Sequence, residues 1–216
     1  FSRYSFVPSA INSAQASVAG ALDVSAGYSA DLNGVLTQTA LAPAINRAFT
    51  LFELSGRTLY IQSREQIESL ADTNDSLLDV AGGTGFHATA RGGKTFGKRN
   101  ATVDQSGATI SRPFATGVVT YGFASGASLG FGFGYADATD TFPGGEGVGS
   151  TRTTGAHVVT RAPVGDFTLS AAAGYAWNAI TTTRVITSLA RTASADTHGH
   201  TWGAAIRASQ IGRAHV

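Results

Sequence analysis

The sequence has no cysteine and no methionine among its 216 residues. Without thiols, the chain forms neither disulfides nor thiolate metal sites. Charged residues are also scarce, at 13% of the chain, against roughly 25% in ordinary globular domains. The formal net charge is +1, which gives no electrostatic reason to expect a nucleic-acid partner.

Long apolar runs are missing too, since no stretch reaches the roughly 18 residues that indicate a membrane-spanning helix. Glycine, in contrast, is abundant, with 27 residues against a usual share of ~7%. Hydrophobic residues make up 43% of the chain, which argues against disorder. Low charge, many glycines and many Ser and Thr residues together favour a β-rich chain with tight turns.

The stretch "LGFGFGY" at 129–135 alternates large apolar residues with glycine. Successive side chains of a strand point to opposite faces, so one face here is apolar and the other nearly bare. In a soluble sandwich the apolar face packs in a core. In a transmembrane barrel it meets lipid, and the face with small residues meets the lumen.

The hydrophobic period divides the chain in two. Up to about residue 80 it is near 3.6, which predicts helices from Pro8-Ser9 onward, near 31–36, near 43–52 and over about 64–80. "AGGTG" at 81–85 ends this pattern, and the period then becomes 2. Six strands are predicted at roughly 86–96, 110–123, 129–139, 151–161, 167–180 and 198–209.

The connections between these strands are unequal and alternate in length. Short connections at 124–128 and 162–166 alternate with long ones at 97–107, 140–150 and 181–197. Short turns on one rim and long loops on the other are typical of outer-membrane barrels. The predicted strands also reach the ~9–11 residues that a tilted strand needs to cross a bilayer.

The predicted fold is all-β, an antiparallel up-and-down transmembrane β-barrel preceded by an α-helical linker. A soluble sandwich remains the alternative, with the same apolar faces covered by a second sheet. On the barrel interpretation the lipid-facing residues are Leu129, Phe131, Phe133, Tyr135, Phe167, Leu169, Tyr175, Trp177, Trp202 and Ile206.

Helices, a glycine-rich break and then long alternating strands form an order that resembles the translocator region of bacterial autotransporters, the type V secretion family. The resemblance covers roughly residues 9 to 209. It is carried by the segments "SREQIESL", "GFHATARGGKTFGKRN", "GVVTYGFASGASLGFGFGYADATDTF", "TLSAAAGYAWNAITTTR" and "ASADTHGHTWGAAIRAS". It implies a protein of the bacterial outer membrane that exports its own N-terminal passenger. The implied partners are outer-membrane lipid, that passenger and the outer-membrane assembly machinery.

The resemblance also implies that the helix before the first strand lies in the barrel pore. Here that helix is the stretch around 63–78, whose charged residues suit a wet lumen better than lipid. Three cations of the strands, Arg91, Lys94 and Arg207, are their suggested partners; the alternative is that all of these are solvated surface charges. The expected lumen residues of the linker are Arg64, Glu65, Glu68, Asp72 and Asp75.

The chain departs from the family pattern in its strand number and its C-terminal end. The family barrel has about twelve strands, and the sequence shows a pattern for six. The tail "IGRAHV" at 211–216 matches the translation of a common sequencing adapter and is expected to be an artefact. The expected division is therefore a helical linker at 1–84, the N-terminal half of a barrel at 85–210 and this tail.

Motifs for catalysis or cofactors are weak. "DTHGH" places Asp196, His198 and His200 together, but no third His or Cys clusters with them. The glycine-rich stretches at 82–85 and 144–149 lack Walker spacing, and no nucleophile, base and acid form a set. We expect no enzyme activity and no cofactor. Three functions remain open: a translocator, an outer-membrane pore or adhesin, and a soluble β-sandwich binding module.

Overall fold

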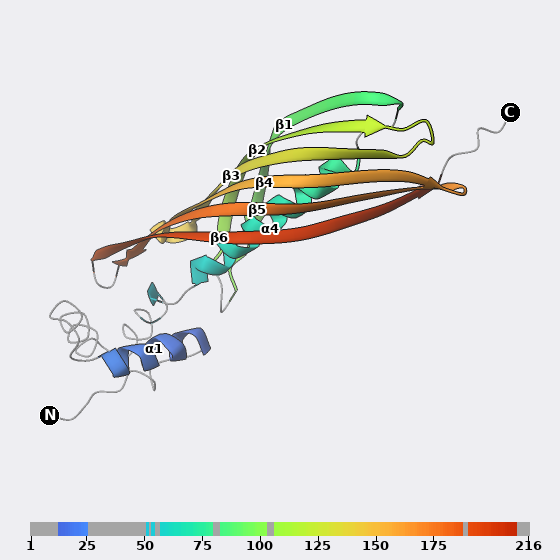
Figure 1. Cartoon of the computed structure of the whole chain (residues 1–216). Helices are drawn as coiled ribbons and strands as arrows, with labels where there is room; N and C mark the ends of the chain where they lie inside the picture. The colour runs from blue at the N-terminus through green and yellow to red at the C-terminus, as the bar shows by residue number, and fades with distance from the viewer. Residues whose placement is uncertain are drawn as a thin grey trace, which may run out of the picture.

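A computed structural model describes residues 13–25, 51, 53–54, 57–79, 83–102, 106–187 and 190–210 (Figure 1). The helix predicted near 31–36, most of the one near 43–52 and the tail at 211–216 lie outside these residues. The described helices are α1 (Ser13–Ser25) and α4 (Arg57–Leu77). None of the helices in this part of the chain combines the length and apolar character needed to cross a membrane.

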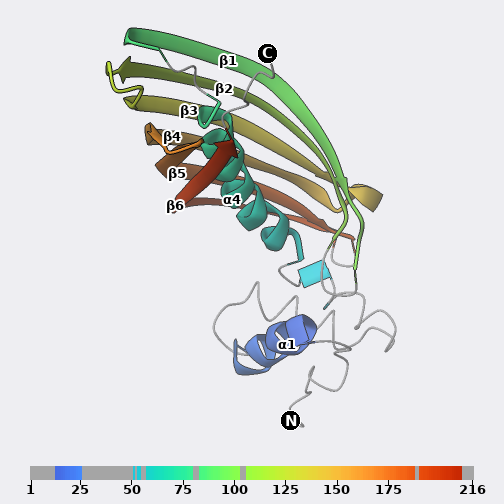
Figure 2. The same ribbon diagram turned by 90° about the vertical axis from the view of Figure 1, so that its right-hand side faces the viewer.

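The six predicted strands are confirmed, and they form one antiparallel sheet in the order β1-β2-β3-β4-β5-β6. Each strand pairs with the next one along the chain, so the topology is up-and-down. The sheet is strongly curved (Figure 2), and the fold class is a partial β-barrel preceded by a helix. The strands are β1 (Gly85–Arg99), β2 (Ala108–Gly122), β3 (Ser128–Phe142), β4 (Gly147–Val164), β5 (Phe167–Ile186) and β6 (Arg191–Gln210).

Two of the three predicted long loops are wrong, because most of their residues continue the strands. β3 and β4 are joined by residues 143–146, and β5 and β6 by residues 187–190. Pairs such as Thr181 with Asp196 extend the ladder through the supposed loop. Both faces of these extensions carry Thr and Ser, so the period-2 apolar signal disappears although the backbone stays extended. At the rim where β3 joins β4 and β5 joins β6, the strands therefore extend beyond the apolar band, and the connections themselves are short.

α4 lies against the concave face of the sheet (Figure 2). Its backbone is closest to β3 through β6, and it stands further from β2. Two small apolar clusters join helix and sheet. The first contains Leu77, Leu78, Val118, Val159 and Ala172, and the second contains Ile61, Ala108, Ile110 and Phe142.

The bare face of "LGFGFGY" is the surface on which α4 lies. A Cβ atom added at Gly132 would be 3.1 Å from Leu77 Cδ1, and one at Gly134 would be 2.7 Å from Thr73 Cγ2. A side chain at either position therefore intrudes on the helix. The glycines of this stretch allow close approach of the helix to the sheet.

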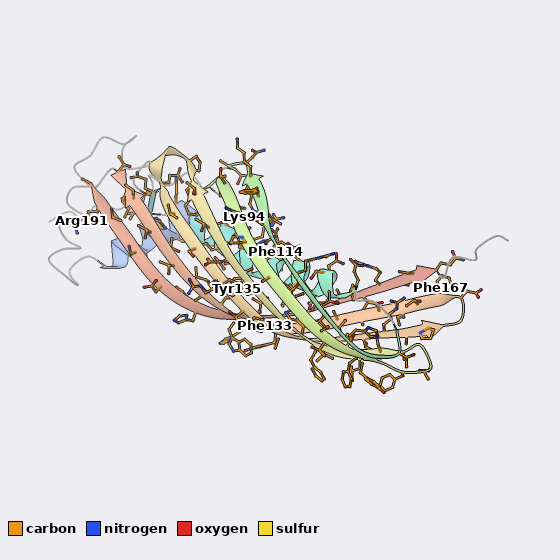
Figure 3. The ribbon with its side chains drawn as sticks, turned by 90° about the horizontal axis from the view of Figure 1, so that it is seen from above. Lys94, Phe114, Phe133, Tyr135, Phe167 and Arg191 are labelled. Carbon is orange, nitrogen blue, oxygen red and sulfur yellow. The ribbon has the colours of Figure 1, made fainter. Side chains whose placement is uncertain are left out.

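The convex face carries the large apolar residues of the strands. Phe131 is 68% exposed and Trp202 is 82% exposed. In the residues that the structure describes, no second sheet covers this face, whereas the sandwich interpretation requires one. Figure 3 places Phe167 and Arg191 at opposite ends of the sheet, with Phe133 between them.

Candidate functional site: the charged face of helix α4

Acidic side chains form a stripe along one side of α4. The spacings are alternately three and four residues, which keeps successive carboxylates on one helix face. The stripe consists of Glu65, Glu68, Asp72, Asp75 and Asp79, the last just beyond the end of the helix. Arginines of three strands reach this stripe.

Arg99 of β1 and Arg112 of β2 bind the first three carboxylates. Arg99 Nη2 donates to Glu65 Oε1 at 3.1 Å and also to Glu68. Arg112 Nη1 donates to Glu65 Oε2 at 3.3 Å, and its Nη2 donates to Asp72. Because Glu65 is only 1% exposed, its charge depends on these two partners to offset the cost of desolvation.

Arg207 of β6 binds the other end of the stripe. Its Nη2 donates to Asp75 Oδ1 at 2.7 Å, and its Nη1 donates to Asp79. These groups are more exposed than the first cluster, and exposed ion pairs contribute little to stability. The two clusters together join the helix to both edges of the described sheet.

Neutral polar groups hold the side of the helix that faces β4 to β6. Asn74 Oδ1 lies 2.8 Å from His157 Nδ1, and Asn74 Nδ2 donates to the Gly203 carbonyl at 3.2 Å. Gln62 accepts from the Thr182 hydroxyl at 2.6 Å. Asn74 is 1% exposed and His157 3% exposed, so the buried His157 ring depends on Asn74 for the hydrogen bond at Nδ1.

The His157 ring lies on a floor of glycines from three strands. Gly134 and Gly155 are paired across β3 and β4, and Gly174 of β5 is directly opposite His157. A Cβ atom at Gly174 would lie 2.3 Å from His157 Nδ1. The glycines therefore make room for the ring as well as for the helix.

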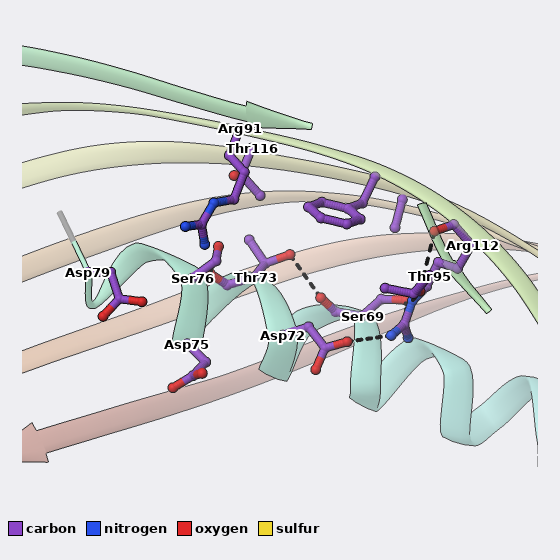
Figure 4. A pocket seen from close by; sticks show the side chains of 12 residues that line it. Ser69, Asp72, Thr73, Asp75, Ser76, Asp79, Arg91, Thr95, Arg112 and Thr116 are labelled. Atoms are coloured by element: carbon purple, nitrogen blue, oxygen red, sulfur yellow. Dashed lines mark hydrogen bonds and ion pairs between the residues drawn. The ribbon is translucent and has the colours of Figure 1, made fainter. Parts of the chain in front are cut away.

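Two cavities lie between α4 and the strands β1 and β2, where the helix stands off the sheet. One has a volume of about 270 Å³ and is shown in Figure 4. The other, of about 230 Å³, is lined by Glu65, Glu68 and Arg99 among others. Arg112 and Thr95 line both cavities, so the ion pairs of Arg112 lie where the two spaces meet.

The expected linker residues all lie on α4. Arg64 is hydrogen-bonded to Glu68 at 2.6 Å on the same helix. Glu65, Glu68 and Asp72 contact Arg99 or Arg112, and Asp75 contacts Arg207. Arg91 lines the larger cavity, and Figure 4 shows it extending toward Ser76.

The suggested pairing of Lys94 with the linker helix is wrong, because Lys94 lies on the convex face and not beside the helix. Its Nζ is 4.9 Å from the centre of the Phe96 ring. Thr95 is paired with Arg112, which faces the helix, so the odd-numbered residues of β1 face inward and the even-numbered ones outward. Arg91 and Lys94 have opposite parity and cannot share a face.

Sequence reasoning missed Arg99, Arg112, Gln62 and Asn74 and found no partner for His157. Arg99 fell in a segment predicted to be a loop. The sequence did contain one usable signal for Arg112. It is an even number of residues from Val118 and Thr120 on β2, so all three side chains lie on the inward face. Nothing local to the sequence pairs His157 with Asn74, since 83 residues separate them.

The expected lipid-facing residues lie on the convex face. Tyr135 is partly buried, and its hydroxyl donates to Asp137 Oδ2 at 3.3 Å. The others are all at least 41% exposed. They are Leu129, Phe131, Phe133, Phe167, Leu169, Tyr175, Trp177, Trp202 and Ile206. In the part of the chain that the structure describes, no three His, Cys, Asp or Glu residues group as metal ligands.

A curved up-and-down sheet with an apolar outer face and a helix on its polar inner face defines a segment of an outer-membrane type of β-barrel. The family model for the autotransporter beta-domain matches residues 88–210, more than half of the chain, and the chain belongs to this family. The family consists of outer-membrane translocators and is generally not enzymatic. No curated protein and no solved structure matches the chain.

Proposed function

We propose that this chain anchors in the bacterial outer membrane and exports an N-terminal passenger to the cell surface, with α4 as the segment that joins passenger and barrel inside the pore. The observation that carries the proposal is the position of α4. It lies on the concave face of the sheet, with buried Glu65 bound to both Arg99 and Arg112.

The two faces of the sheet support a membrane position. The convex face presents Phe131, Phe133 and Trp202, which fit the outward-facing apolar band of a membrane barrel. The concave face is polar and holds a charged helix, which suits a water-filled lumen. Outer-membrane lipid is therefore the proposed partner of the convex face.

Residues 85–210 are proposed as the N-terminal half of the barrel, and residues 1–84 as the linker. In the described sheet β1 and β6 each have one neighbouring strand. An open edge in lipid leaves backbone groups unpaired, at several kcal/mol each. Further strands that pair with β1 and β6 close the barrel in this proposal, and the outer-membrane assembly machinery inserts it.

A simple pore or adhesin explains α4 less well. Such a barrel has no need for a helix whose acidic stripe matches arginines on three strands. A helix that enters the pore from the passenger side needs attachment there, which the two arginine clusters supply. The translocator is therefore the function that the geometry favours.

The test is the location of an epitope placed before α1 in the full-length protein. The epitope should be cleaved by protease added to intact cells. A second epitope in the tight turn at 165–166, between β4 and β5, is the control, because it should be cleaved only after the outer membrane is opened. A protein that sits in the outer membrane with its first epitope protected would contradict export and favour a simple pore.

A further inference from the structure

A shallow hollow lies on the convex face, at the level where the apolar band ends. Its volume is about 430 Å³, and Ala179 of β5 forms part of its lining. Around it stand Arg152 of β4, Trp177 of β5, and His198 and His200 of β6. The strand register explains this grouping, since Arg152 and His198 are the two cross-strand neighbours of the small residue Ala179.

One side of the hollow is aromatic. Tyr175 and Trp177 pack edge to face with ring centres 5.0 Å apart, and His200 stacks on Tyr175 at 5.6 Å. The face of a sugar ring that presents C–H groups packs well against an aromatic ring, because both surfaces are apolar. The size of the hollow and its aromatic side suit one sugar unit better than an extended chain.

The other side carries donors for an anion. Arg152 is 61% exposed and forms an ion pair with Asp137, with Nη2 3.6 Å from Oδ2. At this distance the pair has no hydrogen bond, so the N–H groups of the guanidinium are not used by the carboxylate. Its guanidinium is therefore able to bind an oxyanion through two N–H groups. The nearby carboxylates do not line the hollow and have their own donors, since Asp137 accepts from Tyr135 and Asp196 accepts from Thr181.

The hollow also lies at a defined depth on β5. The outward residues on one side of it are Phe167, Leu169, Ala171, Ala173, Tyr175 and Trp177, and those on the other side begin with Thr181 and Thr183. This is the boundary between the apolar band and the rim that carries residues 100–107, the longest connection between the described strands. The rim with the longer loops is the external one in outer-membrane barrels. Headgroups of the outer leaflet lie at this level.

We propose that this hollow binds the phosphorylated sugar headgroup of a glycolipid in the outer leaflet. The sugar lies over Ala179 against Trp177, and its phosphate binds Arg152 and the N–H groups of His198 and His200. The inference rests on the membrane position proposed above. The proposed membrane position concerns the whole apolar band, whereas the proposed binding site is one patch of the convex face.

The chain offers a built-in probe, because its only two tryptophans, Trp177 and Trp202, are in or next to the site. The full-length protein that contains this chain, folded in detergent micelles, is titrated with diphosphorylated lipid A while tryptophan fluorescence is recorded. We expect a saturable change whose midpoint rises about tenfold or more in Arg152→Gln and in His198→Gln with His200→Gln. Arg152→Lys should retain part of the affinity, because it keeps the charge but loses the planar fork.

Arg161→Gln is the matched control, since it removes the same charge near the β4–β5 turn at the opposite rim. It should bind lipid A as the unmodified chain does. Dephosphorylated lipid A should bind weakly, and inorganic phosphate alone should not saturate the site at millimolar concentration. These two probes separate a lipid headgroup from a free anion.

Equal binding of lipid A by the Arg152→Gln chain, or equal binding of the dephosphorylated lipid, overturns the proposed site. Saturation of the site by inorganic phosphate would mean that the bound phosphate need not come from a lipid, which overturns the proposed ligand. The membrane position is tested separately, by whether the full-length protein is recovered in the outer membrane of intact cells. Recovery there without a preference for lipid A refutes the site alone, whereas absence of the full-length protein from the outer membrane refutes the proposed function.

Discussion

Arg112 on β2 and Glu65 on α4 form an almost completely buried ion pair, with Nη1 3.3 Å from Oε2 and side chains 10% and 1% exposed. Removal of one partner from a buried pair costs about 3–5 kcal/mol when the other charge is left without compensation. Here Arg99 still binds Glu65, so the cost is at the lower end of this range or below it. Arg112 also binds Asp72 and lies where the two cavities beside the helix meet. It is therefore the side chain whose loss should loosen the helix most.

We predict that Arg112→Leu releases α4 from the sheet at a lower temperature than in the unmodified chain, as measured by protease cleavage of the helix. Arg112→Leu combined with Glu65→Leu should be less harmful than the sum of the two single changes. The double change leaves no buried charge without a partner, because Arg99 keeps Glu68 and Asp72 is exposed. Arg64→Gln is the control, because its pair with Glu68 is exposed and contributes less than about 1 kcal/mol. Strict additivity of the two leucine changes would contradict a buried pair.

Gly134 tests whether the glycine face is needed for helix packing. Gly134→Val should displace the helix and cost roughly 1–3 kcal/mol, because a Cβ atom there meets Thr73 Cγ2 at 2.7 Å and His157 Nε2 at 3.1 Å. Gly117→Val should be tolerated, since a Cβ atom at Gly117 meets nothing within 4 Å. Thermal unfolding of the two variants in the same detergent compares them directly, and equal losses would contradict the assignment of the faces.

Asn74 and His157 give a prediction for the neutral side of the helix. Asn74→Leu leaves the His157 ring buried without its partner and should cost about 1–3 kcal/mol. The double variant Asn74→Leu with His157→Leu should recover part of that loss. Thermal unfolding of both single variants and the double variant measures the coupling, and no coupling would mean that the pair does not form.

The sequence predicted the number of strands and their order. It also predicted which side chains lie on which face, wherever one face carries large apolar residues and the other carries small ones. The alternation from Leu129 to Tyr135 was sufficient for β3, because the residues on the convex face and those that face the helix differ in kind. It failed in the extensions, where Thr181 and Thr183 lie on one face and Thr182 on the other. A strand with two polar faces has no periodic signal, so its residues were predicted to form loops.

The site was only partly predictable for a related reason. The acidic stripe of α4 is local to one helix and could be read from its spacing. Its partners come from three strands. Side chains of a strand alternate between the two faces, so a partner can be predicted only when it is known which alternate residues face inward. In β1 the adjacent Gly92 and Gly93 interrupt the alternation of side-chain types and hide that assignment. That is why Arg207 was proposed correctly as facing the helix whereas Lys94 was not.

Phe133 tests the membrane position of the convex face. It lies within the apolar band of β3 and is 53% exposed. Phe133→Arg should lower the stability of the folded protein in phosphatidylcholine vesicles by about 2–4 kcal/mol, because the charge must sit in hydrocarbon. Thr139→Arg is the matched control, since it is on the same face of the same strand but beyond Asp137, in the polar extension, where the cost is about 0–1 kcal/mol. Urea unfolding from vesicles gives both values. A similar small loss for the two variants would mean that water, and not lipid, covers Phe133.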